Sequence, residues 1–250
     1  MTAREQLEAL LVSKLEPAAI ARRGAANTPA FVGQRIEIPN VKFTEAELEE
    51  RRKSTGASEA AGRHGMNGFQ FNGDALASIV QMIREKWGAP PHFTGNAATS
   101  CGQHVEHGLA CHFADAHGFE LYAVKKGAPV AHPDYPFMTA SVDRLVRVNG
   151  FWSILEIKHT SRYRNWGKED LTTEFPMRHK LQLAHQMFVT GIDHAYLGAD
   201  VAGKPRLFQM ERDPALERRV IDCAVDFWDH VRNHTLPEAP FLAKHAIKGD

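Results

Sequence analysis

The chain has 250 residues, and 43% of them are hydrophobic, which excludes a disordered composition and is enough for a substantial core. Its 30 Lys and Arg residues balance its 30 Asp and Glu residues, so the formal net charge is zero. This balance gives no support to a general, uniformly basic nucleic-acid coat protein. Any contact with DNA must therefore come from a local concentration of charge.

Cysteine content and hydropathy bear on the cellular compartment. Cys101, Cys111 and Cys223 form no CxxC pair, which is typical of free thiols in a reducing cytosol. No apolar run approaches the roughly 18 residues of a membrane span. The charged N-terminus resembles neither a signal peptide nor an anchor. We therefore expect a soluble, cytoplasmic protein without membrane contact, in the cytoplasm of a bacterial host if a phage encodes it.

The first half of the chain contains mainly helix signals. Thr44 and Glu47 have the spacing of a capping box, and Asp74 precedes an apolar stripe that Gly88 closes. Together the signals predict helices over residues 3–15, over residues 17–23, from Thr44, from Asp74 to Gly88, and over residues 96–117.

In the second half the pattern changes to strands. The predicted elements are strands 119–124, 137–148 and 151–158, a helix over 177–190, a hairpin of strands 194–201 and 205–211, and a last helix from Asp213. This order predicts an α/β fold in which helices cover a mixed sheet, and not a regular doubly wound fold.

The stretch from Asp143 to Lys158 contains the most informative pattern. Asn149-Gly150 between two β-rich runs is the strongest short hairpin signal. If these two residues form the turn, Asp143 lies directly opposite Glu156, and Lys158 shares their face of the sheet. The opposite face is then the core face, and it collects Val142, Val146, Val148, Phe151, Leu155 and Ile157.

Two carboxylates directly opposite each other destabilise a sheet unless a cation compensates them. A divalent metal between Asp143 and Glu156 would do so. Lys158 can then orient or help to deprotonate a water molecule. Two alternatives remain open: the charges can belong to an ordinary surface hairpin, or one bulge residue can move Asp143 to the other face.

Several segments together resemble a known family. Asp143…Glu156-Ile157-Lys158 matches the D…(D/E)XK signature of the PD-(D/E)XK nucleases, with Val142 in place of the proline. Further segments resemble, in the family's order, the lambda-type phage alkaline exonucleases and the YqaJ viral recombinases. These are Arg51…Gly56-Ala57-Ser58-Glu59, Gly102-Gln103-His104-Val105-Glu106, Gln182 to Thr190, and Glu211-Arg212-Asp213.

The resemblance implies a fold and a set of roles. Residues 51–250 would form a single PD-(D/E)XK, restriction-endonuclease-like nuclease domain, and residues 1–50 an N-terminal helical extension. The resemblance implies two bound Mg²⁺ ions, which Mn²⁺ can replace. Their implied ligands are Asp143, Glu156, the Ile157 carbonyl and Glu106. The other implied roles are water positioning by Lys158, support of the site by Gln182, and binding of a DNA phosphate by Arg51 and Ser58.

The resemblance also implies an activity and partners. It implies a processive 5′→3′ exonuclease that acts on double-stranded DNA ends and leaves a 3′ single strand for phage-type recombination. A homotrimeric ring and a single-strand annealing protein as partner are implied as well. The alternatives are a restriction- or repair-type endonuclease on the same core and a DNA-binding module without catalysis.

Two other groups of residues invite a functional interpretation. Basic residues outnumber acidic ones over residues 141–180, and Tyr163 and Trp166 among them can either stack on bases or pack a loop. The helix over 96–117 contains Cys101, His104, His107 and Cys111. Their spacing drifts around the helix, so it predicts a His-rich helix near DNA more than a zinc or iron–sulfur site.

Overall fold

The computed structural model describes residues 11–14, 44–66, 73–92, 95, 97–124, 129–162 and 164–247. The predicted helix over 17–23 and most of the one over 3–15 lie outside these residues. Within them, no helix combines the length and the apolar character that a membrane crossing needs.

The described strands form two sheets. The larger has the order β1-β3-β6-β7-β8-β9, and the smaller has the order β2-β5-β4. Neighbours in the larger sheet are antiparallel, except that β7 and β8 are parallel. The strands are β1 (Leu11–Lys14), β2 (Thr55–Gly56), β3 (Glu120–Val124), β4 (Val130–Ala131), β5 (Met138–Ala140), β6 (Arg144–Val148), β7 (Phe151–Thr160), β8 (His194–Val201) and β9 (Lys204–Glu211).

Most helices begin and end where the sequence predicts. Thr44 and Glu47 form the expected capping box, Asp74 caps the next helix through the amide of Ala77, and Gly191 ends α6 with φ 70°. The helical elements are α2 (Glu45–Arg52), η1 (Ala57–Glu59), α3 (Ala60–Arg63), α4 (Ala75–Lys86), α5 (Ala97–His117), α6 (Met177–Thr190), α7 (Pro214–Arg232) and α8 (Ala239–His245).

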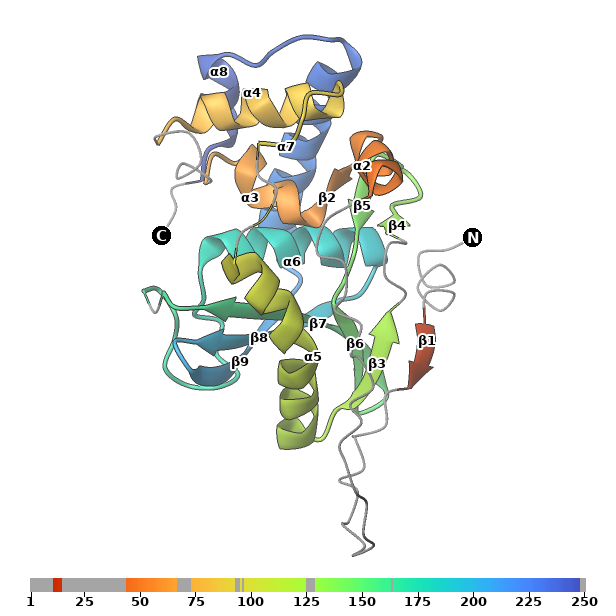
Figure 1. Ribbon diagram of the computed structural model, residues 1–250, viewed down its shortest axis with the longest axis vertical. Helices are drawn as coiled ribbons and strands as arrows, with labels where there is room; N and C mark the ends of the chain where they lie inside the picture. The colour runs from red at the N-terminus through yellow and green to blue at the C-terminus, as the bar shows by residue number, and fades with distance from the viewer. Residues whose placement is uncertain are drawn as a thin grey trace, which may run out of the picture.

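Helices cover both faces of the larger sheet. Helix α5 packs on one face through a core cluster that includes Phe113, Val146 and Leu155. Helix α6 joins the parallel strands β7 and β8 and packs on the other face, over Leu145 and Ile154. Figure 1 shows α6 running between the sheet and a group of helices that comprises α3, α4, α7 and α8. The predicted α/β architecture is therefore confirmed.

Close approach of α5 to the sheet depends on a glycine. A Cβ atom added at Gly198 of β8 would lie 2.5 Å from Phe113 Cδ2. Because a real Cβ is essentially never that close to another heavy atom, any larger residue would push α5 away from the sheet. Gly198 thus sets the distance at which α5 lies over β7 and β8.

Two predictions about the elements are wrong in part, and one helix was not predicted. Residues 11–14 are a strand paired with β3 and not part of a helix, because pairing with an open sheet edge outweighs a marginal short helix. The predicted strand 137–148 is broken at 141–143, where the chain leaves the smaller sheet and enters the larger. Helix α8 was not predicted, since its position depends on packing of Phe241 against α4 and α7.

The hairpin buries apolar side chains on both of its faces, and not only on the face that was predicted to be the core face. Val146, Leu155 and Ile157 are buried as expected, whereas Phe151 is 77% exposed beside the hairpin turn. On the opposite face, which carries Asp143 and Glu156, Leu145 and Ile154 are fully buried beneath α6. The carboxylates therefore lie in a covered part of the fold and not on an open sheet surface.

Candidate active site

The β6–β7 hairpin has the register that the sequence predicts. Pairing runs from Val148 opposite Phe151 to Arg144 opposite Leu155 without a bulge. The turn residues Asn149 and Gly150 have positive φ angles of 51° and 86°, as a type I′ turn requires. This register excludes the bulged alternative, in which Asp143 would lie on the other face.

Asp143 precedes β6 and is tied to the neighbouring strand. Its Oδ2 accepts a hydrogen bond of 2.8 Å from the backbone N–H of Ile157. Glu156 adjoins Ile157 on β7. The carboxylates of Asp143 and Glu156 therefore lie near each other at the open end of the hairpin, opposite the turn. The structure brings these two predicted ligands together.

Glu156 is 3% exposed and accepts hydrogen bonds from several side chains. Lys158 Nζ and Gln182 Nε2 donate to its Oε1 at 2.5 and 2.6 Å. Gln186 Nε2 donates to Oε2 at 2.8 Å and to the carbonyl of Ser141 at 2.9 Å. A supporting role was predicted for Gln182 but not for Gln186, although four-residue spacing on one helix places both on the same face.

Helix α5 contributes Glu106 to the same region. Arg144 Nη1 donates to Glu106 Oε1 at 2.7 Å and to the carbonyl of Asp143 at 2.5 Å. Both side chains are largely buried, at 11% exposed for Arg144 and 18% for Glu106. Arg144 was not predicted as part of the site, because a lone arginine at a strand start carries no signal until α5 packs beside it.

The electrostatics of this cluster are those of an undercompensated group of acids. Burial above all, together with the charges of Glu156 and Glu106, raises the pKa of Asp143 to about 7, against the opposing charge of Lys158 and the hydrogen bond from the Ile157 N–H. Burial by itself lowers the pKa of Lys158, but the charges of Glu156 and Asp143 outweigh it and raise that pKa. The cluster therefore favours an added cation.

The donor set suits a hard divalent cation. Asp143, Glu156, Glu106 and the Ile157 carbonyl offer oxygen atoms alone, which Mg²⁺ and Mn²⁺ prefer. In the described part of the chain, however, no three His, Cys, Asp or Glu side chains are arranged as a metal site. The carboxylates instead accept hydrogen bonds from Ile157, Lys158, Gln182, Gln186 and Arg144. The residues fit such a cation in charge and in donor type.

The predicted phosphate-binding residues lie on a neighbouring segment. Arg51 is in the last turn of α2 and Ser58 is in η1, and both are exposed. Strand β2 lies between them and pairs in parallel with β5, which leads directly to Asp143. The structure thus connects the Arg51–Ser58 segment to the carboxylate cluster through β5.

Comparison with known proteins identifies the family. The family model of the YqaJ-like viral recombinase domain matches residues 48–193, more than half of the chain. The chain belongs to this family. Every site residue predicted from the sequence lies within the matched range. The resemblance proposed from the motifs is therefore confirmed.

A curated relative of this YqaJ-like chain is the "Uncharacterized protein YqaJ" of Bacillus subtilis (strain 168), with 29% identity over 188 residues. The match covers 73% of this chain and 54% of the relative, so the chain spans about half of that protein's length.

Solved structures share the fold. The alkaline exonuclease LHK-Exo from Laribacter hongkongensis matches with a TM-score of 0.58 and 18% identity over 76% of this chain and 94% of its own. LHK-Exo in complex with dAMP matches with the same TM-score and 19% identity. The YqaJ-like chain therefore has the mixed α/β fold of the PD-(D/E)XK nucleases.

Packing decides between the two roles left open for Trp166. Trp166 is 8% exposed and packs against Phe208 and His179, so it belongs to the loop's core, while Tyr163 lies outside the described residues. On α5, His107 Nε2 lies 3.8 Å from Cys111 Sγ.

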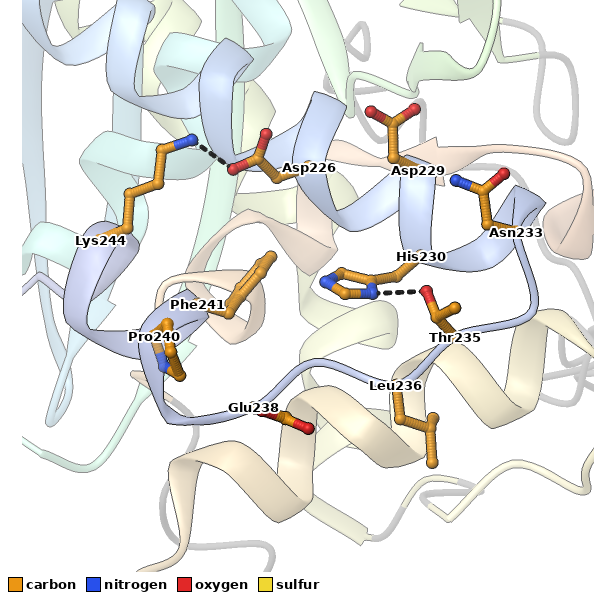
Figure 2. Close-up of a pocket in the computed structure, with 10 residues that line it drawn as sticks. All are labelled: Asp226, Asp229, His230, Asn233, Thr235, Leu236, Glu238, Pro240, Phe241 and Lys244. Carbon is orange, nitrogen blue, oxygen red and sulfur yellow. Dashed lines mark hydrogen bonds and ion pairs between the residues drawn. The ribbon is translucent and has the colours of Figure 1, made fainter.

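A separate pocket lies outside the YqaJ-like match, between α7 and α8 (Figure 2). Its charged groups are largely paired with each other or with near neighbours. Asp226 accepts from Lys244 and His245, and His230 shares a hydrogen bond with Thr235. Its lining includes none of the predicted site residues, so the candidate chemistry belongs to the hairpin and not to this pocket.

Proposed function

We propose that this protein is a Mg²⁺-dependent exonuclease that degrades double-stranded DNA ends 5′→3′ and leaves a 3′ single strand for phage-type recombination. The observation that carries the proposal is that the half-buried Asp143 lies beside the buried Glu156 and Lys158 in a YqaJ-like domain. The fold relative LHK-Exo is an alkaline exonuclease and was solved with dAMP, a deoxynucleoside monophosphate. That ligand belongs to the product class expected of an exonuclease.

Asp143, Glu156, the Ile157 carbonyl and Glu106 would hold the two Mg²⁺ ions, and Mn²⁺ can substitute. When bound, Mg²⁺ supplies positive charge to the phosphoryl group under attack and favours deprotonation of a bound water molecule. Gln182 and Gln186 keep the Glu156 carboxylate in a fixed orientation through their hydrogen bonds to its two oxygens. Lys158 places an ammonium group at Glu156 Oε1, where it can orient the attacking water.

The reaction is hydrolysis of a phosphodiester. The water oxygen forms a bond to phosphorus, and the bond from phosphorus to the 3′ oxygen of the terminal nucleotide breaks. The released nucleotide takes a proton on that oxygen, and the shortened strand retains a new 5′-phosphate. Each cycle therefore regenerates the same kind of DNA end, which favours an enzyme that recognises a 5′-phosphate.

Duplexes labelled at one end test this proposal. With Mg²⁺, a 5′ label should appear first as a mononucleotide, and a 3′ label should remain on the shortened strand until late. Early release of the 3′ label would reverse the polarity. Absence of nucleotide release with both Mg²⁺ and Mn²⁺ would favour the alternative of a DNA-binding module without catalysis.

Arg51 and Ser58 are expected to bind the terminal 5′-phosphate. A guanidinium can bind a phosphate bidentately, and a charge-assisted contact is worth roughly 1.5–3 kcal/mol. Arg51→Ala should therefore digest 5′-phosphorylated ends roughly 10- to 100-fold more slowly, about as slowly as wild type digests 5′-hydroxyl ends. The two defects should not add, because both remove the same contact.

Arg52→Ala is the matched control, because Arg52 lies on the same helix and is paired with Glu49 at 2.6 Å. This variant should retain the wild-type preference for phosphorylated ends. The measurement compares wild type and each variant on 5′-phosphorylated and 5′-hydroxyl ends. If Arg51→Ala also retains the full preference for phosphorylated ends, Arg51 does not recognise the end.

We further propose a homotrimeric ring and a single-strand annealing protein as partner, both on the basis of the family resemblance. A protein with zero net charge gains processivity most simply by encircling DNA. Light scattering should therefore report about three times the mass of one chain. A monomer at concentrations where digestion is processive would remove this proposal.

A further inference from the structure

A fully buried arginine lies beneath the segment that carries Ser58. Arg63 in α3 is 0% exposed. Its Nη1 donates to Thr55 Oγ1 at 2.5 Å and to the carbonyl of Gly56 at 3.3 Å, and its Nη2 contacts His185 Nδ1 at 3.1 Å. The guanidinium therefore joins β2 to helix α6, two elements that are far apart in sequence.

His185 continues this connection to β5. Its Nε2 lies 3.0 Å from the carbonyl oxygen of Thr139. A guanidinium can only donate, so Nδ1 must accept from Arg63 and the proton must be on Nε2. Burial and the charge of Arg63 lower the pKa of His185 to about 3, in keeping with a neutral imidazole. Both ring nitrogens thus have fixed roles.

Through Thr55, Arg63 is also connected to the backbone of Arg51. Glu59 accepts from Thr55 Oγ1 at 2.8 Å and from Lys86 Nζ at 2.7 Å. Lys86 Nζ also donates to the carbonyl oxygen of Arg51 at 2.9 Å. Hydrogen bonds therefore run continuously from Arg51, past the Ser58 segment, to α6.

Helix α6 also fixes Glu156, the candidate metal ligand on β7. Gln182 and Gln186 both donate to Glu156, and His185 directly precedes Gln186. Adjacent residues of α6 therefore hold both the β5 segment, at Thr139 and Ser141, and Glu156. A shift of His185 would change the position of the Ser58 segment relative to Glu156.

Stability alone does not account for this arrangement. Burial of a guanidinium is costly, and a buried ionic network is often replaceable by apolar side chains without loss of stability. Arg63 Nε, moreover, has no hydrogen-bond partner among the described residues. What the network provides is a unique geometry between the elements that it joins.

We propose that Arg63 and His185 are positioning residues that set the distance between the end-phosphate segment, Arg51 and Ser58, and the catalytic carboxylate Glu156. The pair thereby makes cleavage depend on a phosphorylated 5′ end seated at Arg51 and Ser58. This inference rests on the proposed function, because it presumes cleavage and recognition of the end.

His185→Leu tests the inference, with kcat/KM measured on matched duplexes that end in 5′-phosphate or 5′-hydroxyl. Wild type should prefer the phosphorylated end by roughly 10- to 100-fold. The variant should lose most of this preference, mainly through slower cleavage of phosphorylated ends. His185→Gln should restore it, because the amide retains one acceptor for Arg63 and one donor for Thr139.

Leu183→Ala is the matched control, because Leu183 is fully buried on the same helix but faces the apolar core. It should lower Tm and slow digestion of both ends equally, without changing the preference. If His185→Leu does not fold, the double variant Arg63→Met/His185→Leu removes the charge together with its partner and should show the same lost preference.

The outcomes separate this inference from the proposed function. A wild type that discriminates between ends, together with a His185→Leu or double variant that discriminates equally well, would overturn the positioning role and leave the proposed function intact. A wild type that releases nucleotides equally from both ends would overturn the end-phosphate assignment and the inference with it. A wild type without nuclease activity would overturn the proposed function first.

Discussion

Glu156→Ala is expected to lower the rate of DNA cleavage by about 10³-fold or more while the protein remains folded. Metal-assisted charge stabilisation contributes several kcal/mol to such reactions, and each factor of ten in rate corresponds to about 1.4 kcal/mol. Lys158→Ala should have a similarly large effect, because it removes the ammonium group at Glu156 Oε1. Single-turnover cleavage of a linear duplex measures both.

Folding of Glu156→Ala is expected because removing one carboxylate relieves repulsion between the acids of the metal-free cluster. Lys158 retains the charge of Asp143 as a partner when Glu156 is removed. Glu169→Ala, at an exposed carboxylate of the loop before α6, is the matched control and should cleave at the wild-type rate. Cleavage by Glu156→Ala at near the wild-type rate would show that the hairpin carboxylates are not the site.

Asp143→Asn is expected to stabilise the metal-free protein, and to do so more at pH 8 than at pH 5. The pKa of Asp143 is about 7 in the folded protein, against about 3.9 for an unperturbed aspartate. A carboxyl group whose pKa is raised on folding favours the folded state below about pH 4, and this contribution is lost as the pH rises through about 7. The full cost at pH 8 is on the order of 2–4 kcal/mol.

The asparagine removes this cost, because it carries no charge and can still accept from the N–H of Ile157. Urea unfolding in EDTA at the two pH values measures the difference. Asp134→Asn, at an exposed aspartate, is the control and should show no such pH dependence. Mg²⁺ should stabilise wild type at pH 8 and not Asp143→Asn. Equal stability of variant and wild type at pH 8 in EDTA would contradict the electrostatic account.

The hairpin and its carboxylate pair were predictable from the sequence because their geometry is local. Asn149-Gly150 fixes the turn, the turn fixes the register, and the register places Asp143 beside β7 near Glu156. Helix ends at Thr44, Asp74 and Gly191 were predictable for the same reason, since capping depends on residues within one turn.

The contacts that complete the site were not predictable because they depend on tertiary packing. Arg144 meets Glu106 once α5 lies on the sheet, and Gln186 reaches Glu156 once α6 crosses from β7 to β8. The Arg63–His185 contact joins residues 122 positions apart in sequence. No local propensity indicates such pairs, and burial of polar side chains runs against hydrophobic patterning.

The proposed exonuclease activity depends on a metal site built on Asp143 and Glu156. The most direct measurement is digestion of a linear duplex and of the same sequence as a covalently closed circle, by wild type and by Glu156→Ala. We expect wild type with Mg²⁺ to release mononucleotides from the linear DNA, to leave the circle intact, and to stop in EDTA, while the variant is inactive. Cutting of the closed circle would instead indicate an endonuclease, and release of nucleotides by Glu156→Ala or in EDTA would contradict the assigned site.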